Sequence, residues 1–261
     1  MSEDAERLVT RGVSARIRRG GAGPPVLYLH GAGGWLPWLP FFERLSRRYA
    51  VNVPEHPCFG ASDDPHWMRD VADMAMYYLD VIETAFAAPV HVIGHSLGGW
   101  IAAEAATRNV GRIASLTLLA PAGVRVKGIP PGDNFIWSRE EAARNRFHDQ
   151  RLAEAFLQMP PPTDEQLDRE LQNRVAAAKF GWEPRWFNPA LEKWLHRIAV
   201  PTHVVWGRDD KVLPSAYAVV WAERVPGVEI TMVEACGHAP HIEKSDLVTE
   251  KVLAFLDRVS A

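Results

Sequence analysis

The sequence predicts an α/β fold in which a mostly parallel sheet carries helices on both faces and is interrupted by a helical insertion. In the first half of the chain, short apolar runs rich in Val, Ile and Leu alternate with longer amphipathic stretches, a pattern typical of buried parallel strands joined by helices. The alternation stops near Gly123 and resumes near Val200. With 261 residues, 47% of them hydrophobic, the chain can bury one large core and still carry an inserted sub-domain.

The elements of the first half follow from the spacing of apolar residues. In the longest amphipathic stretch Met74, Tyr77, Tyr78 and Val81 recur at intervals of three and four, which indicates one buried helix face. The expected helices are 40–49, 67–87 and 97–108. The expected strands are 26–30, 51–54, 90–94 and 116–120.

The middle of the chain has a different character, because prolines divide it into short pieces. Ser138 with Glu141, and Thr163 with Gln166, match the capping box that opens a helix. We therefore expect two or three helices joined by proline turns, which form a cap over residues 123–197. The core would then consist of residues 1–122 and 198–261.

The strand and helix rhythm returns after the insertion. An apolar run at 203–206 and another at 228–233 are expected strands, and the stretches 216–224 and 247–259 have helical spacing. The core sequence thus brackets the insertion, and we expect the two parts to form a single sheet.

Charge and cysteine content exclude several classes of protein. A formal net charge of -3 with scattered Lys and Arg gives no basic surface for nucleic acid or an anionic membrane. The run Arg16, Arg18 and Arg19 is interpreted as a solvated strand end. Residues 1–10 do not resemble a secretory signal and no run reaches membrane-spanning length, so we expect a cytoplasmic protein in which Cys58 and Cys236 are reduced thiols.

The strongest local motif is the sequence Gly-His-Ser-Leu-Gly-Gly at 94–99, placed between an expected strand and an expected helix. A chain that turns this sharply has no room for bulky residues on either side of the serine, and Gly94 and Gly98 meet that requirement. The turn would lift the Ser96 hydroxyl above the sheet, and the Leu97 amide would point to the same place. The motif predicts a serine nucleophile.

A serine nucleophile needs a base, and His238 is the best placed of the ten histidines. It follows the last expected strand in the sequence Cys-Gly-His-Ala-Pro, so it lies at the carboxyl edge of the sheet, on the same side as Ser96. His241 is the alternative, three residues further on.

The base in turn needs an acid, and the sequence Trp-Gly-Arg-Asp-Asp at 206–210 ends another expected strand at the same edge. Asp210 is the preferred acid and Asp209 the alternative. The order Ser, Asp, His along the chain is the one expected for this architecture.

A second oxyanion donor is expected from the Gly-rich loop His-Gly-Ala-Gly-Gly at 30–34, directly after the first core strand. The amide of Ala32 is the candidate, to act together with that of Leu97. The loop lacks the Gly-Lys-Ser ending of a P-loop and the spacing of a dinucleotide fingerprint, so no nucleotide cofactor is expected.

Together these motifs resemble the α/β-hydrolase superfamily, in the capped serine-nucleophile branch that includes carboxylesterases, lactonases and carbon-carbon bond hydrolases. The resemblance covers nearly the whole chain and includes residues 54–63, where many members carry an aspartate in place of Glu55. It implies a metal-independent acyl-enzyme mechanism without a cofactor, and it favours Asp210 over Asp209. Carbon-carbon bond hydrolases of this kind usually carry a tryptophan after the catalytic histidine, where this chain has Ala239.

We therefore expect a hydrolase that cleaves a small, mostly apolar carboxylic ester. The aromatic residues near the motifs and in the insertion suggest an apolar pocket, with Trp35, Phe59 and Trp137 as candidate substrate contacts. A lactonase and a carbon-carbon bond hydrolase are the alternative enzymes. A small-molecule receptor is the alternative from another class. The expected partner is a small-molecule substrate, and the sequence gives no indication of the oligomeric state.

Overall fold

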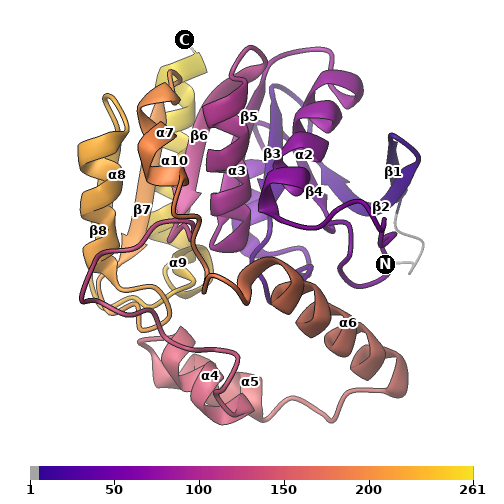
Figure 1. Ribbon diagram of the computed structural model, residues 1–261, viewed down its shortest axis with the longest axis vertical. Coiled ribbons are helices and arrows are strands. Elements are labelled where there is room, and N and C mark those ends of the chain that lie inside the picture. The colour runs from indigo at the N-terminus through magenta and orange to yellow at the C-terminus, as the bar shows by residue number, and fades with distance from the viewer. Residues whose placement is uncertain (1–5, 261) are drawn as a thin grey trace.

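In the computed structural model, which describes residues 6–260, one eight-stranded sheet runs through the molecule (Figure 1). The strand order is β1-β2-β4-β3-β5-β6-β7-β8, with β3 to β8 parallel and the β1-β2 hairpin antiparallel at one edge. The α/β fold with a mostly parallel sheet is thus confirmed. The strands are β1 (Glu6–Thr10), β2 (Val13–Gly20), β3 (Pro25–Leu29), β4 (Ala50–Pro54), β5 (Val90–His95), β6 (Ile113–Leu119), β7 (Thr202–Gly207) and β8 (Glu229–Val233).

Helices cover both faces of the sheet, because side chains of successive strand residues point to opposite faces. Val26 and Tyr28 of β3 pack in the cluster under α1 and α10, whereas Leu27 and Leu29 pack under α2, α3 and α8. The helices are α1 (Pro40–Leu45), α2 (Val71–Ala85), α3 (Leu97–Arg108), α4 (Arg139–Arg146), α5 (Gln150–Leu157), α6 (Asp164–Gly181), α7 (Leu191–Trp194), α8 (Ala218–Arg224), α9 (Pro240–Glu243) and α10 (Ser245–Ser260), with short 3-10 turns η1 (Leu195–Arg197) and η2 (Ser215–Tyr217).

Most helices begin and end where the sequence pattern indicates. Helix α3 has the expected bounds, and α2 begins later than expected because the Asp70 side chain accepts the Asp73 amide and caps it. Helix α1 is shorter than expected and ends at Leu45, and the chain continues through residues 46–48 as hydrogen-bonded turns. These differences concern helix ends only.

The β1-β2 hairpin is a feature that the sequence pattern did not reveal. The expectation of a solvated strand end at Arg16 is wrong, because Arg16 lies inside β2 and forms an ion pair with the buried carboxylate of Glu55 at 2.6 Å. Arg18 stacks on the ring of Trp35. Both guanidinium groups are used in packing the edge of the sheet.

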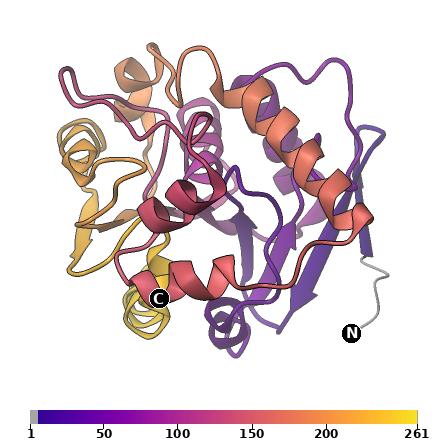
Figure 2. The same cartoon turned by 90° about the horizontal axis from the view of Figure 1, so that it is seen from below.

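The insertion between β6 and β7 forms helices at the carboxyl end of the strands. Figures 1 and 2 show α4, α5 and α6 lying across this end of the sheet. Both expected capping boxes are present, at Ser138 of α4 and Thr163 of α6. Helix α7 and turn η1, by contrast, pack on the core through Leu191 and Leu195.

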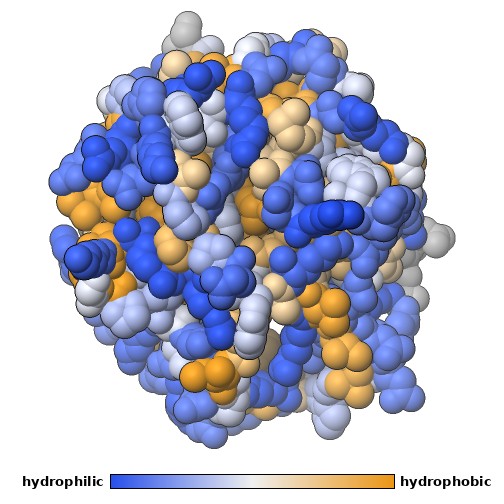
Figure 3. Space-filling model, viewed as in Figure 1, coloured by the Kyte–Doolittle hydropathy of each residue, from blue (hydrophilic) through white to orange (hydrophobic). Residues whose placement is uncertain are grey.

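The surface is mostly hydrophilic on the face shown in Figure 3, with smaller hydrophobic areas over the insertion. Leu167, Leu171 and Val175 are exposed at intervals of four along α6, so this face of the helix does not contribute to the core. No helix within residues 6–260 has the length and apolar content needed to cross a bilayer. Cys58 and Cys236 are buried free thiols, as expected.

Candidate active site

Ser96 occupies a strained turn between β5 and α3. Its backbone has φ 53° and ψ -113°, a conformation that costs a non-glycine residue on the order of 1–3 kcal/mol. The turn is tight on both sides: a Cβ on Gly94 would lie 2.4 Å from the Gly98 carbonyl oxygen, and one on Gly98 would lie 2.0 Å from that of Leu29. Only glycine fits at these two positions, and the tightness holds the Ser96 hydroxyl up at the end of the sheet.

The structure brings Ser96, His238 and Asp210 into one hydrogen-bonded chain. His238 Nε2 lies 2.9 Å from Ser96 Oγ, and His238 Nδ1 lies 2.8 Å from Asp210 Oδ2. His238 and Asp210 are 4% and 6% exposed, whereas Ser96 is only half-buried. The hydroxyl is therefore the member of the chain that a substrate can reach.

The Asp210 carboxylate is held by four donors. Oδ1 accepts the amides of Val212 and Leu213, both at 2.9 Å, and Oδ2 accepts the indole N–H of Trp206 besides His238. Together these bonds fix the orientation of the carboxylate. With Oδ2 accepting from Nδ1, the imidazole carries its proton on Nδ1 and leaves Nε2 free to accept the serine proton.

The two alternative residues lie elsewhere. Asp209 is half exposed and pairs with His148 at 3.0 Å. His241 is fully buried, and its Nε2 lies 2.9 Å from the Tyr28 hydroxyl. Neither side chain is hydrogen-bonded to Ser96, His238 or Asp210.

The Gly-rich loop after β3 lies directly against Ser96. A Cβ on Gly31 would be 3.3 Å from Ser96 Cβ. The Gly31 carbonyl is bound by His30 Nδ1 at 2.7 Å and by the Gly34 amide at 3.1 Å. Because carbonyl and N–H point in opposite directions across a trans peptide, the Ala32 amide is turned away from these donors. Within residues 6–260 neither Ala32 nor Leu97 donates its amide to a protein acceptor, so both are available to an oxyanion.

Two buried histidines, His30 and His56, hold this loop, a role that the sequence motifs did not predict. The His56 amide donates to His30 Nε2 at 2.9 Å, His56 Nε2 donates to the His30 carbonyl at 2.8 Å, and the Tyr78 hydroxyl lies 2.6 Å from His56 Nδ1. Each bond assigns a tautomer, and all require neutral imidazoles. His95, likewise unexpected, lies 2.9 Å from the His238 carbonyl through its Nε2.

The buried histidines of the protein are expected to make its stability depend on pH. Burial lowers the pKa of His30 and of His203 to about 4, and that of His241 to about 3. Between these values and about 6.5 the unfolded chain binds more protons, so each group stabilises the folded protein fully above pH 6.5 and less as pH falls. We expect the free energy of unfolding, measured with urea, to fall by several kcal/mol from pH 7 to pH 4.5. A flat profile across that range would contradict the assignment of neutral buried histidines.

The three aromatic residues expected to contact substrate lie in different surroundings. Trp35 donates its indole N–H to the Val53 carbonyl and lies under Arg18. Phe59 is fully buried and stacks on Phe180 of α6. Trp137 lies against Gly132. None of the three is hydrogen-bonded to the proposed triad, and their contact with substrate stays a prediction.

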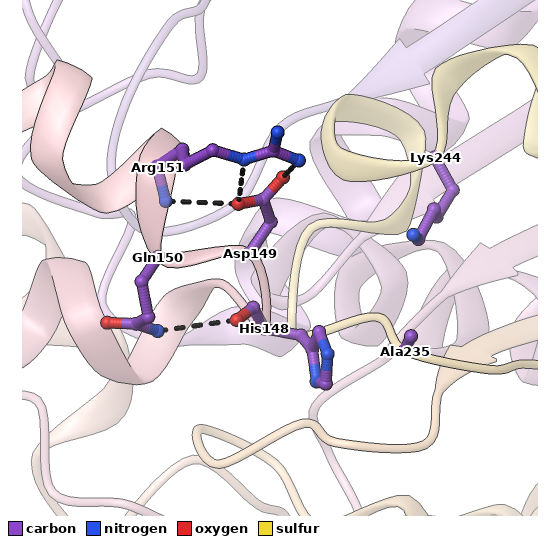
Figure 4. A pocket seen from close by; sticks show the side chains of 6 residues that line it. All are labelled: His148, Asp149, Gln150, Arg151, Ala235 and Lys244. Atoms are coloured by element: carbon purple, nitrogen blue, oxygen red, sulfur yellow. Dashed lines mark hydrogen bonds and ion pairs between the residues drawn. The ribbon is translucent and has the colours of Figure 1, made fainter.

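A surface hollow of about 350 Å³ is lined by His148, Asp149, Gln150, Arg151, Ala235 and Lys244 (Figure 4). Asp149 and Arg151 pair with each other at its wall, and none of Ser96, His238 and Asp210 lines it. Across residues 6–260, no three His, Cys, Asp or Glu side chains are grouped so as to hold a metal ion.

Comparison with known proteins identifies the family. The sequence model of the alpha/beta hydrolase family matches residues 26–251, so the chain belongs to this family of hydrolases. A 2-hydroxymuconate semialdehyde hydrolase from Pseudomonas sp. (strain CF600) is 25% identical over 278 residues, covering 99% of this chain and 96% of that protein.

Solved structures share the fold. A membrane phospholipase A described as a bacterial virulence factor is similar with a TM-score of 0.81 and 25% identity, over 98% of this chain and 86% of that chain. An esterase from Exiguobacterium antarcticum has a TM-score of 0.78 and 20% identity, over 98% and 100% of the two chains. The similar proteins thus include an esterase, a phospholipase and a 2-hydroxymuconate semialdehyde hydrolase.

Proposed function

We propose that this protein is a serine hydrolase that cleaves a small, mostly apolar carboxylic ester through an acyl-enzyme. The observation that carries the proposal is the chain of hydrogen bonds from Asp210 through His238 to Ser96. This is the arrangement that converts a weakly nucleophilic hydroxyl into an attacking group.

The geometry gives each group a step. His238 Nε2 takes the Ser96 proton as Oγ bonds to the ester carbonyl carbon, and the amides of Ala32 and Leu97 hold the resulting oxyanion. The alcohol leaves with the proton from His238. Water then attacks the acyl-enzyme in the same way, which releases the carboxylic acid and restores the serine. Asp210 holds the imidazole throughout.

A carbon-carbon bond hydrolase is the second candidate, and the curated relatives named for such reactions favour it. The packing of Ala239 speaks for the ester instead. Ala239 is 1% exposed and packs with Ala143, Phe147 and Ala153 of the insertion. Helices α4 and α5 occupy the space that a larger side chain after His238 would need, so the tryptophan expected of that branch does not fit.

A matched set of substrates tests the proposal. We expect p-nitrophenyl esters to be hydrolysed with the highest kcat/KM for acyl chains of intermediate length, because the pocket is expected to be apolar and small. A lactone and a vinylogous diketone acid, assayed in parallel, should be turned over at least about 100-fold more slowly. Turnover of the diketone alone would contradict the proposal, and equal rates for all acyl chains would contradict the apolar pocket.

A further inference from the structure

Arg146 ends helix α4 directly on the loop that carries His238. Its carbonyl oxygen accepts the His238 amide at 2.8 Å. A Cβ on Gly237 would come within 2.4 Å of the same oxygen, so no side chain can separate the two backbones. This contact fixes the base of the Arg146 side chain beside the proposed catalytic histidine.

The guanidinium of Arg146 reaches the other loop of the site. Nη2 lies 3.0 Å from the position that a Cβ of Gly33 would take, one residue beyond Ala32. A Cβ on Gly31 would in turn lie 3.3 Å from Ser96 Cβ. Gly31 and Gly33 are two residues apart, so the Arg146 guanidinium and the Ser96 side chain lie against the same short loop.

This cation has no counter-charge. Within residues 6–260 no carboxylate lies within 4.0 Å of the Arg146 guanidinium and no acceptor takes a hydrogen bond from it, whereas Arg144, two residues earlier, pairs with Glu140 at the surface. The side chain is half-buried, and burial lowers its pKa. A guanidinium withdrawn from water without a partner costs free energy, which an incoming anion would offset.

The surroundings of the guanidinium leave the charge uncompensated. His95 and His241 have pKa values lowered first by burial, then by neighbouring histidines and also by the Arg146 charge. Both imidazoles are neutral, so neither supplies a counter-charge to Arg146. A planar guanidinium matches a carboxylate through two parallel hydrogen bonds.

We propose that Arg146 binds a carboxylate on the substrate, so that the preferred ester is a half-ester of a dicarboxylic acid. A mostly apolar chain would link the carbonyl that Ser96 attacks to the carboxylate that Arg146 binds. The inference rests on the proposed function and names the substrate class for the same site.

Two esters with the same six-carbon acyl chain test the proposal: mono-p-nitrophenyl adipate, which ends in a carboxylate, and p-nitrophenyl hexanoate, which ends in a methyl group. The wild-type protein should favour the adipate by at least about 10-fold in kcat/KM. Arg146→Met should reduce this ratio about 10-fold, Arg146→Lys should reduce it less, and Arg144→Met should retain it. A wild-type ratio of one or below, or an unchanged ratio in Arg146→Met, would overturn the proposal. Should Arg146→Met fail to fold, Arg146→Lys carries the comparison.

Binding without turnover separates this inference from the proposed function. Free adipate should bind the Ser96→Ala protein in a calorimetric titration, and Arg146→Met in the same background should weaken binding at least about 10-fold. If neither ester is hydrolysed, the ester proposal fails, and this titration alone decides the role of Arg146. Adipate binding that is absent, or that survives Arg146→Met, would refute carboxylate recognition.

Discussion

Replacing Ser96 by alanine is expected to abolish ester hydrolysis, with kcat lowered by at least about 10⁴-fold. Among Asp210, His238 and Ser96, which are linked by hydrogen bonds, the Ser96 Oγ atom is the group that bonds to the carbonyl carbon. The residual turnover of the variant would therefore come from the oxyanion amides and substrate binding alone. The measurement is p-nitrophenol release under saturating substrate. Unfolding in urea should show a stable fold, because alanine keeps the same backbone at this turn.

A second serine and histidine pair in the sheet provides a matched control. Ser115 Oγ lies 2.8 Å from His91 Nδ1, and Ser115 is fully buried. This pair has no carboxylate on the far nitrogen of the imidazole, which lies 3.1 Å from the Ser260 hydroxyl instead. Ser115→Ala should therefore leave kcat within about 3-fold. If Ser96→Ala kept a tenth of wild-type turnover, Ser96 would not be the nucleophile.

The core of the fold could be predicted because its signals are local. Helix α3 follows from the apolar spacing after Gly94, and the parallel strands follow from short apolar runs. The β1-β2 hairpin could not be predicted in this way, because the charged residues of β2, among them Arg16, leave no apolar run that would indicate a strand. Its ion pair with Glu55 joins residues far apart in sequence, and a one-dimensional pattern does not contain such a pairing.

The candidate site also has one part that the sequence predicts and one part that it does not. Ser96, His238 and Asp210 each follow a strand, and parallel strands end at one edge of the sheet, so their meeting could be expected from order alone. The residues that hold the loops of the site could not be predicted in this way. His56 is placed by bonds to His30 and Tyr78, and these bonds depend on packing between β3, the loop after β4, and α2. Asp209 and Asp210 are adjacent, and the preference for Asp210 that the family resemblance gave agrees with the turn geometry, which turns Asp210 toward His238 and Asp209 toward His148.

Replacing Asp210 by asparagine is expected to lower kcat by roughly 10⁴-fold while leaving the fold intact. Oδ1 would still accept the amides of Val212 and Leu213. At the other position the asparagine NH₂ would face the Nδ1 proton of His238, so the imidazole would move its proton to Nε2. In that tautomer Nε2 donates to Ser96 and cannot accept its proton.

The neighbouring aspartate supplies the control for this tautomer argument. Asp209→Asn removes only a half-exposed partner of His148. Exposed ion pairs contribute about 1 kcal/mol or less to the free energy of unfolding, so the fold should persist and kcat should stay within about 3-fold of the wild-type value. Loss of kcat in Asp210→Asn should come with little change in KM, because the carboxylate orients the base and does not touch substrate. An equal loss of kcat in both variants would contradict the assignment of Asp210 as the single acid. A loss of kcat in Asp209→Asn alone would identify Asp209 as the residue that orients His238.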